Sequence, residues 1–135
     1  MKNLLKMTIA ATAALTLTTS LHAMDEKKDC DVKANGIVQV IATANVYNDE
    51  AKKKGLEFRR LEVNNSDLII AVEEAIKTGA KEVNPKTFKG KKSKTVLETN
   101  YAAQRACKFA ISALTQAQEA KLSWRLAVPG DGYKY

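Results

Sequence analysis

The chain has only two cysteines, Cys30 and Cys107, and they lie far apart in a sequence of 135 residues. No Cys-x-x-Cys motif is present, so a redox or metal-binding pair is a weaker interpretation than a structural disulfide. Such a bond would hold the beginning of the folded chain against a C-terminal helix. A loop of this length adds at most about 4–5 kcal/mol to the free energy of unfolding, through the entropy that the unfolded chain loses.

A secretory signal peptide is predicted over residues 1–23. Lys2 and Lys6 form a basic start, an apolar run rich in alanine and threonine covers residues 7–19, and a small residue, Ala23, ends the segment. The run is too short to cross the bilayer core of roughly 30 Å, which needs about 20 apolar residues. We therefore expect cleavage after Ala23 and no membrane span.

The expected cleavage divides the chain into a signal peptide (1–23), a polar N-terminal arm (24–35) and a single globular domain (36–135). A mature protein of this kind would reside in an oxidising compartment, most simply a bacterial periplasm. The two cysteines would then pair, and Cys30 would be the main anchor of the arm.

The only histidine, His22, lies within the predicted signal peptide. Without an imidazole, the mature chain cannot build serine triads, Cys-His dyads or histidine-ligated metal sites. The sequence also lacks a Walker phosphate loop and a Ser-x-x-Lys motif. We therefore expect no catalytic residues, no cofactor and no metal site. A hydrolase or transferase that uses carboxylate or lysine chemistry is the alternative.

Hydrophobic patterns predict three strands and two helices. Strands are expected over residues 38–46 and 122–128, where apolar residues alternate, and over 56–63 with a bulge; helices are expected over 67–78 and 95–121, and mostly loop over 80–94. The first strand has a competitor, because Ile37, Val40 and Ala44 would share one face of a helix. Thr95 and Glu98 fit a capping box at the start of the second helix.

The predicted fold class is α+β, with two helices on one face of a small antiparallel sheet in the order β-β-α-α-β. A helical bundle is the alternative. Both arrangements can bury a single core in a chain of this length.

Five lysines in nine residues form the sharpest charge feature of the sequence. They are Lys86, Lys89, Lys91, Lys92 and Lys94. A cluster of this kind attracts polyanions through long-range electrostatics. We interpret it as an anion-binding segment, and a solvated loop is the simpler alternative.

Asn64, Asn65 and Ser66 form an N-x-Ser acceptor sequence for glycosylation. Glu62 precedes the acceptor by two residues, so the segment resembles the extended acidic sequon of some bacterial N-glycosylation systems. The resemblance covers five residues and implies a glycan on Asn64. A helix cap is the alternative role for these side chains.

The sequence indicates a small exported protein without catalytic activity that binds another component of the cell envelope. The chain has 22 Lys and Arg against 15 Asp and Glu, a net charge of +7, which favours an anionic partner. The expected partner is an envelope protein or an anionic glycan or lipid, and not nucleic acid. Self-association through the alanine-rich helix and inhibition of a cell-wall lytic enzyme are further alternatives.

N-terminal sequencing of the protein isolated from its native cells tests the predicted export. We expect the mature chain to begin at Met24, because the peptidase cleaves after the small residue Ala23. A native chain that begins at Met1 would contradict both the cleavage and the periplasmic location.

Overall fold

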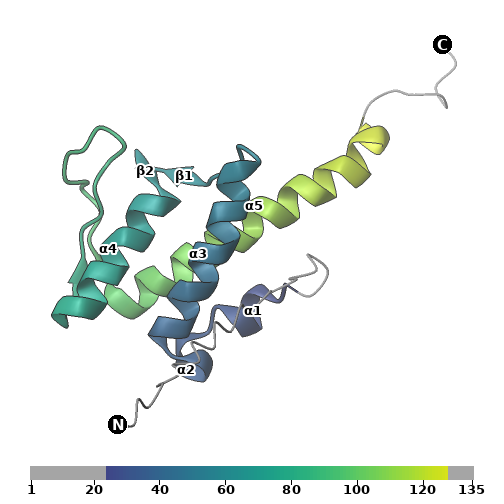
Figure 1. The fold of residues 1–135 in the computed structure, drawn as a ribbon. Helices are drawn as coiled ribbons and strands as arrows, with labels where there is room; N and C mark the ends of the chain where they lie inside the picture. Colours follow the sequence, from purple (N-terminus) through teal and green to yellow (C-terminus); the bar gives the residue numbers. More distant parts are fainter. Residues whose placement is uncertain (1–23, 128–135) are drawn as a thin grey trace, which may run out of the picture.

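The computed structural model describes residues 24–127, with side chains placed for residues 24–123. The helices are α1 (Glu26–Asp29), α2 (Val32–Asn35), α3 (Ile37–Lys53), α4 (Asn65–Thr78) and α5 (Thr99–Ala127), and the strands are β1 (Arg59–Arg60), β2 (Val63–Asn64), β3 (Glu82–Val83) and β4 (Leu97–Glu98) (Figure 1). The predicted signal peptide lies outside the described residues. None of the described helices is long and apolar enough to cross a membrane.

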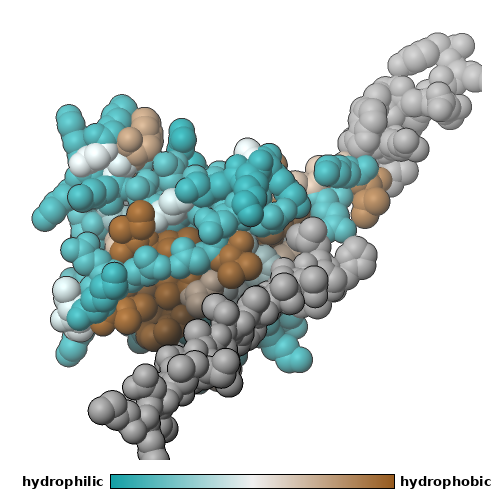
Figure 2. All heavy atoms as spheres, viewed as in Figure 1, coloured by the Kyte–Doolittle hydropathy of each residue, from teal (hydrophilic) through white to brown (hydrophobic). Residues whose placement is uncertain are grey.

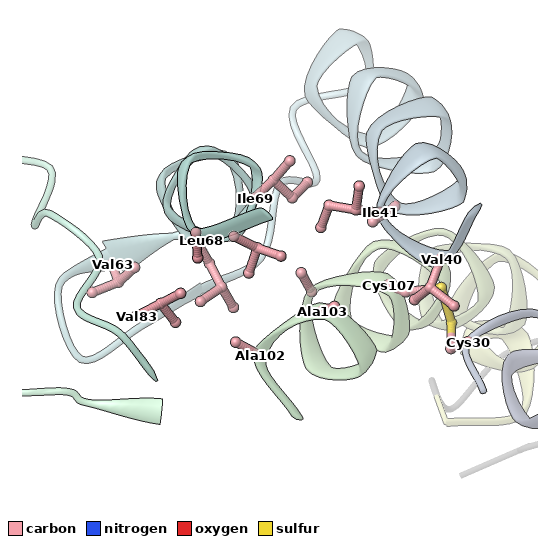
Figure 3. Close-up of a cluster of buried hydrophobic side chains, with 14 of the residues drawn as sticks. Cys30, Val40, Ile41, Val63, Leu68, Ile69, Val83, Ala102, Ala103 and Cys107 are labelled. Atoms are coloured by element: carbon pink, nitrogen blue, oxygen red, sulfur yellow. A yellow bond between two sulfur atoms is a disulfide. The ribbon is translucent and has the colours of Figure 1, made fainter. Parts of the chain in front are cut away.

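The hydrophobic core lies between α3, α4 and the first part of α5 (Figure 3). Helix α4 contributes Leu68, Ile69 and Val72, and α5 contributes a row of fully buried alanines, Ala102, Ala103, Ala106 and Ala110. Small side chains reduce the distance between packed helix axes, so α3 and α4 can both lie close to α5.

The predicted strand over residues 38–46 is wrong, because this segment belongs to α3. Val40 and Ala44 are fully buried, whereas Val38 is 64% exposed and Val46 is 45% exposed. Burial therefore follows the helical period and not the alternation of apolar residues. The buried positions of α3 are Val40, Ile41, Ala44, Asn48 and Ala51. The helical alternative describes this segment correctly.

The predicted strand over residues 122–128 is also wrong, because α5 continues to Ala127. Figure 1 shows this end of the helix extending beyond the packed helices. Leu122 is 74% exposed, so the alternation of apolar residues here does not mark a buried sheet face. Val128 lies outside the described residues.

Helix α5 begins four residues later than predicted, at Thr99. Glu98 caps it directly: its carboxylate accepts hydrogen bonds from the backbone N–H groups of Asn100 at 3.1 Å and Tyr101 at 2.9 Å. The Thr99 hydroxyl donates to the carbonyl oxygen of Ala80 at 2.7 Å. Glu98 is therefore the cap itself, and the box with Thr95 does not form.

The predicted bulged strand over residues 56–63 is a hairpin instead. Strand β1 pairs antiparallel with β2, and Arg60 lies opposite Val63. The two turn residues, Leu61 and Glu62, have φ angles of 49° and 64°. Positive φ at both positions is the pattern of a type I′ turn, which Asn-Gly pairs adopt at lower cost than other residues.

The segment 80–94 is mostly loop, as predicted, but it opens with strand β3. This strand pairs antiparallel with β4 and places Val83 opposite Leu97. The two sheets are separate and have two strands each. The order β-β-α-α-β over one sheet is therefore wrong. The class α+β holds only loosely, and a helical bundle with two small sheets describes the core equally well.

The N-terminal arm contains the two short helices α1 and α2 and is fastened to α5. The predicted disulfide between Cys30 and Cys107 is confirmed, with 5.5 Å between the two Cα atoms. Both cysteines are buried. The Ser112 hydroxyl donates to the Glu26 carboxylate at 3.0 Å. The arm therefore covers part of the core, with the disulfide at its centre.

The double variant Cys30→Ser/Cys107→Ser tests the contribution of this bond. We expect the free energy of unfolding to fall by about 2–5 kcal/mol, because the reduced chain regains the entropy of a long loop. Urea unfolding monitored by circular dichroism gives the value, and chemically reduced wild-type protein should match the variant. Equal unfolding midpoints for oxidised wild type and variant would contradict the expectation.

Candidate functional site

The five predicted lysines lie on a hairpin-like loop that internal hydrogen bonds hold in shape. Asn84 donates from its amide to the carbonyl oxygens of Ser93 at 2.9 Å and Thr95 at 2.8 Å. Lys86 lies opposite Lys92 in an isolated antiparallel bridge. The loop therefore presents its lysines from a defined backbone, and we call it the lysine loop (86–94).

The lysine loop is attached to the turn of the β1–β2 hairpin. The Phe88 N–H donates to the Glu62 carbonyl oxygen at 2.9 Å, and the Lys89 ammonium lies 3.7 Å from the Glu62 carboxylate. The Arg59 guanidinium lies over the Phe88 ring, 4.8 Å from its centroid. These contacts fix the loop next to the hairpin, where a cation–π pair adds to the backbone hydrogen bond.

Four of the five lysines line one hollow of about 510 Å³. They are Lys89, Lys91, Lys92 and Lys94, and the hollow also includes Glu62, Leu61 and Thr95. Lys86 is exposed but does not line it. The structure thus brings together most of the predicted anion-binding residues. Figure 2 shows hydrophilic side chains over the region of the two small sheets, whereas hydrophobic side chains gather over α3 and α4.

A second basic hollow, which we call the arginine groove, lies beside the hairpin and was not predicted. It has a volume of about 330 Å³ and is lined by Arg60, Tyr101, Gln104, Arg105, Lys108 and Phe109. Three of these side chains are cationic and none is acidic. The groove combines positive charge with two aromatic rings, which suits an anion that also carries an apolar part.

Stacked aromatic rings position the guanidinium group of Arg105. Its carbon Cζ lies 5.1 Å from the centroid of the Phe109 ring, and Phe109 stacks on Phe58 with 4.1 Å between centroids. Phe58 comes from the segment before β1, whereas Arg105 and Phe109 lie one turn apart on α5. The cation–π contact restrains the guanidinium at the wall of the groove.

Beside the arginine groove is a small, mostly apolar recess of about 30 Å³. Arg60, Arg105 and Phe109 line both spaces, so the recess and the groove are neighbours. Asn65 is 2% exposed and belongs to the recess wall. Its Oδ1 has no hydrogen-bond partner among the described residues. A buried acceptor of this kind is costly unless a donor reaches it.

The three hollows are neighbours that share lining residues, and we call their combined lining the basic track. The recess shares Leu61 and Thr95 with the lysine-lined hollow, just as it shares both arginines with the groove. The cations of the track are Arg60, Arg105, Lys108, Lys89, Lys91, Lys92 and Lys94, and its only carboxylate is that of Glu62. Such one-sided charge attracts and steers anionic partners.

Asn64, the predicted glycosylation site, lies at the end of β2 and is half-buried. Its Oδ1 accepts a hydrogen bond from Arg59 Nε at 2.7 Å. The hydroxyl of Ser66, the third residue of the acceptor sequence, donates to the Glu57 carboxylate. A transferase that needs this hydroxyl would meet it freely only before the segment folds. Glycosylation stays a prediction.

A buried polar network includes Asn65 of the recess wall and connects α3, α4 and α5. The Asn65 amide donates to Asn48 Oδ1 at 3.0 Å and to the Ala106 carbonyl oxygen at 2.9 Å. Asn48 donates in turn to Glu57 at 3.2 Å, and the Ser66 N–H donates to the same carboxylate oxygen at 2.8 Å. Glu57 therefore caps α4 from a distant position in the sequence.

The pKa of Glu57 reflects opposing effects. Burial raises the pKa, but hydrogen bonds from Ser66 and Asn48 and the charge of Lys52 together lower it below the ordinary value of 4.5. The ionised form is therefore favoured in the folded state.

Within residues 24–127, no three His, Cys, Asp or Glu side chains come close enough together to hold a metal ion. Comparisons of the chain with protein-family models, with curated proteins and with solved structures find no match. The geometry of the basic track is therefore the basis for assigning a function.

Replacing Glu57 by Gln tests the polar network. Because the pKa of Glu57 is lower in the folded chain than in the unfolded chain, its ionised carboxylate stabilises the fold at pH values above the unfolded-state pKa near 4.5. This stabilisation is lost as the pH falls through the folded-state pKa. We expect Glu57→Gln to lower the melting temperature at pH 7 by a few degrees and to match wild type in strong acid. Glu74→Gln, at an exposed position of α4, is the control. A constant difference at every pH would contradict the assignment.

Proposed function

We propose that this protein is a non-catalytic binding protein, exported to the periplasm, whose basic track holds an anionic component of the cell envelope. The proposal rests on one observation: seven cations and one carboxylate line three neighbouring hollows that share lining residues. Clefts lined by charge of one sign raise the local concentration of oppositely charged partners and speed their association.

The track has features of a binding surface beyond its net charge. The arginine groove presents guanidinium groups beside aromatic rings, and the lysine loop is fixed by its own hydrogen bonds. A binding surface held by fixed elements loses less conformational entropy when its partner binds. These observations support recognition of a ligand over the simpler interpretation of a solvated loop.

The half-buried carboxylate of Glu57 has a structural use that agrees with a non-catalytic role. Glu57 Oε1 accepts from Ser66 and from Asn48 and stabilises the start of α4. These contacts account for the carboxylate as part of the scaffold. We accordingly propose the track for binding and assign no residue to bond breaking.

Neutralising the arginine groove tests the proposal. We expect Arg60→Gln/Arg105→Gln/Lys108→Gln to bind fluorescently labelled dextran sulfate, a simple polyanion, roughly 10- to 100-fold more weakly than wild type. Each exposed ion pair is worth up to about 1 kcal/mol, and three are lost. Fluorescence anisotropy measures the affinity, which should fall for wild type as salt rises.

The matched control is Lys27→Gln/Lys28→Gln/Lys33→Gln, which removes the same charge from exposed positions of α1 and α2. We expect this control to bind nearly as tightly as wild type. Equal losses in the two variants would show that only net charge matters, and this result would contradict a site at the track.

A further inference from the structure

We propose that the basic track binds an extended acidic segment of a partner protein, with carboxylates paired to Arg60 and Arg105 and a neighbouring apolar side chain against Tyr101 and Phe109. This inference rests on the proposed function and adds the class of partner and the mode of recognition. It follows from the shape of the track, the type of its cations and the exposed apolar side chains beside them.

The extent of the track over three neighbouring hollows favours a ligand with the form of a chain. The arginine groove shares Arg60, Arg105 and Phe109 with the recess, and the lysine-lined hollow shares Leu61 and Thr95 with it. An extended polypeptide advances about 3.3 Å per residue, so successive acidic side chains can meet successive cations. A single small anion would use only one of the hollows.

The cations of the groove differ in kind from those of the loop. Two of the three are arginines, and the guanidinium of Arg105 is restrained by the Phe109 ring at 5.1 Å. A planar guanidinium donates two parallel hydrogen bonds to a carboxylate, whereas a lysine ammonium acts as a point charge. The groove is therefore suited to specific recognition, and the lysine loop to general attraction.

The apolar and polar groups of the track match a peptide. Tyr101 is 51% exposed and Leu61 is 70% exposed, which leaves apolar surface for a neighbouring side chain of the partner. The recess of about 30 Å³ is close to the volume of one water molecule, so it admits only a small group.

The shape of the site also separates a peptide from a lipid surface. The cations line hollows of about 330 and 510 Å³, into which a narrow chain can enter. A flat bilayer contacts protruding side chains and does not enter hollows. The combination of concave shape and guanidinium groups therefore favours an acidic polypeptide.

The test uses the full mature chain and a fluorescently labelled synthetic peptide rich in glutamate with one central leucine. The variant Arg60→Lys/Arg105→Lys retains the positive charge but loses the planar donors. We expect it to bind the peptide about tenfold more weakly than wild type and to bind dextran sulfate equally well. Lys27→Gln/Lys28→Gln is the control, because both lysines are exposed on α1 and line none of the three hollows, and it should leave peptide affinity nearly unchanged.

Three results would overturn the inference while leaving the proposed function intact. The first is equal peptide affinity for wild type and Arg60→Lys/Arg105→Lys, which would mean that charge alone is recognised. The second is equal affinity for a peptide in which serine replaces the central leucine. The third is tighter binding to vesicles of phosphatidylglycerol than to the peptide. Loss of dextran sulfate binding in the lysine variant would instead indicate damage to the whole track, and circular dichroism checks its folding.

Discussion

The close packing of α3 against the alanine face of α5 is the contact on which the rest of the structure depends. Val40 and Ala44 of α3 and Ala106 and Ala110 of α5 are fully buried. Because alanines leave little between the two backbones, larger side chains in their place would separate the helices. Cys107 belongs to the same face, so the disulfide fixes the N-terminal arm to the helix that organises the core. This helix also carries every residue of the arginine groove except Arg60.

Sequence patterns predicted the elements that local chemistry determines. Helix α4 has a clear hydrophobic face and ends at Gly79, whose left-handed conformation stops it. The strand prediction for residues 38–46 was wrong because this sequence of small and β-branched apolar residues fits both a strand and a helix. Its 17-residue helix is selected by burial against α5, which is a tertiary effect that the pattern does not contain. The strand predicted over residues 122–128 was wrong because α5 continues to Ala127, and Leu122 is exposed there and not part of a buried face.

The candidate site also has one part that the sequence predicted and one part that it did not. The lysine loop was found from sequence because its residues are neighbours, and the charge density is visible in one short window. The arginine groove was not found, because Arg60 and Arg105 lie on different elements and meet only after the β1–β2 hairpin packs beside α5. The two consecutive arginines at 59 and 60 were a signal, since neighbouring residues of a strand point to opposite sides. In the structure Arg59 faces Phe88 and Arg60 faces the groove.

Two local features beside the basic track lower the stability of the folded chain. Leu61 and Glu62 hold positive φ angles in the turn, which costs roughly 1–2 kcal/mol for each residue other than glycine. Asn65, whose buried Oδ1 has no partner, lies in the wall of the adjoining recess. Departures from local rules concentrate at functional sites, because elsewhere a simpler residue would be more stable. An Asn-Gly turn would relieve the strain, but it would remove Leu61 from the wall between the recess and the lysine-lined hollow. Positive charge and backbone strain thus occur together at the lysine-lined hollow, beside a buried polar group, and this combination supports the proposed binding role over that of a solvated loop.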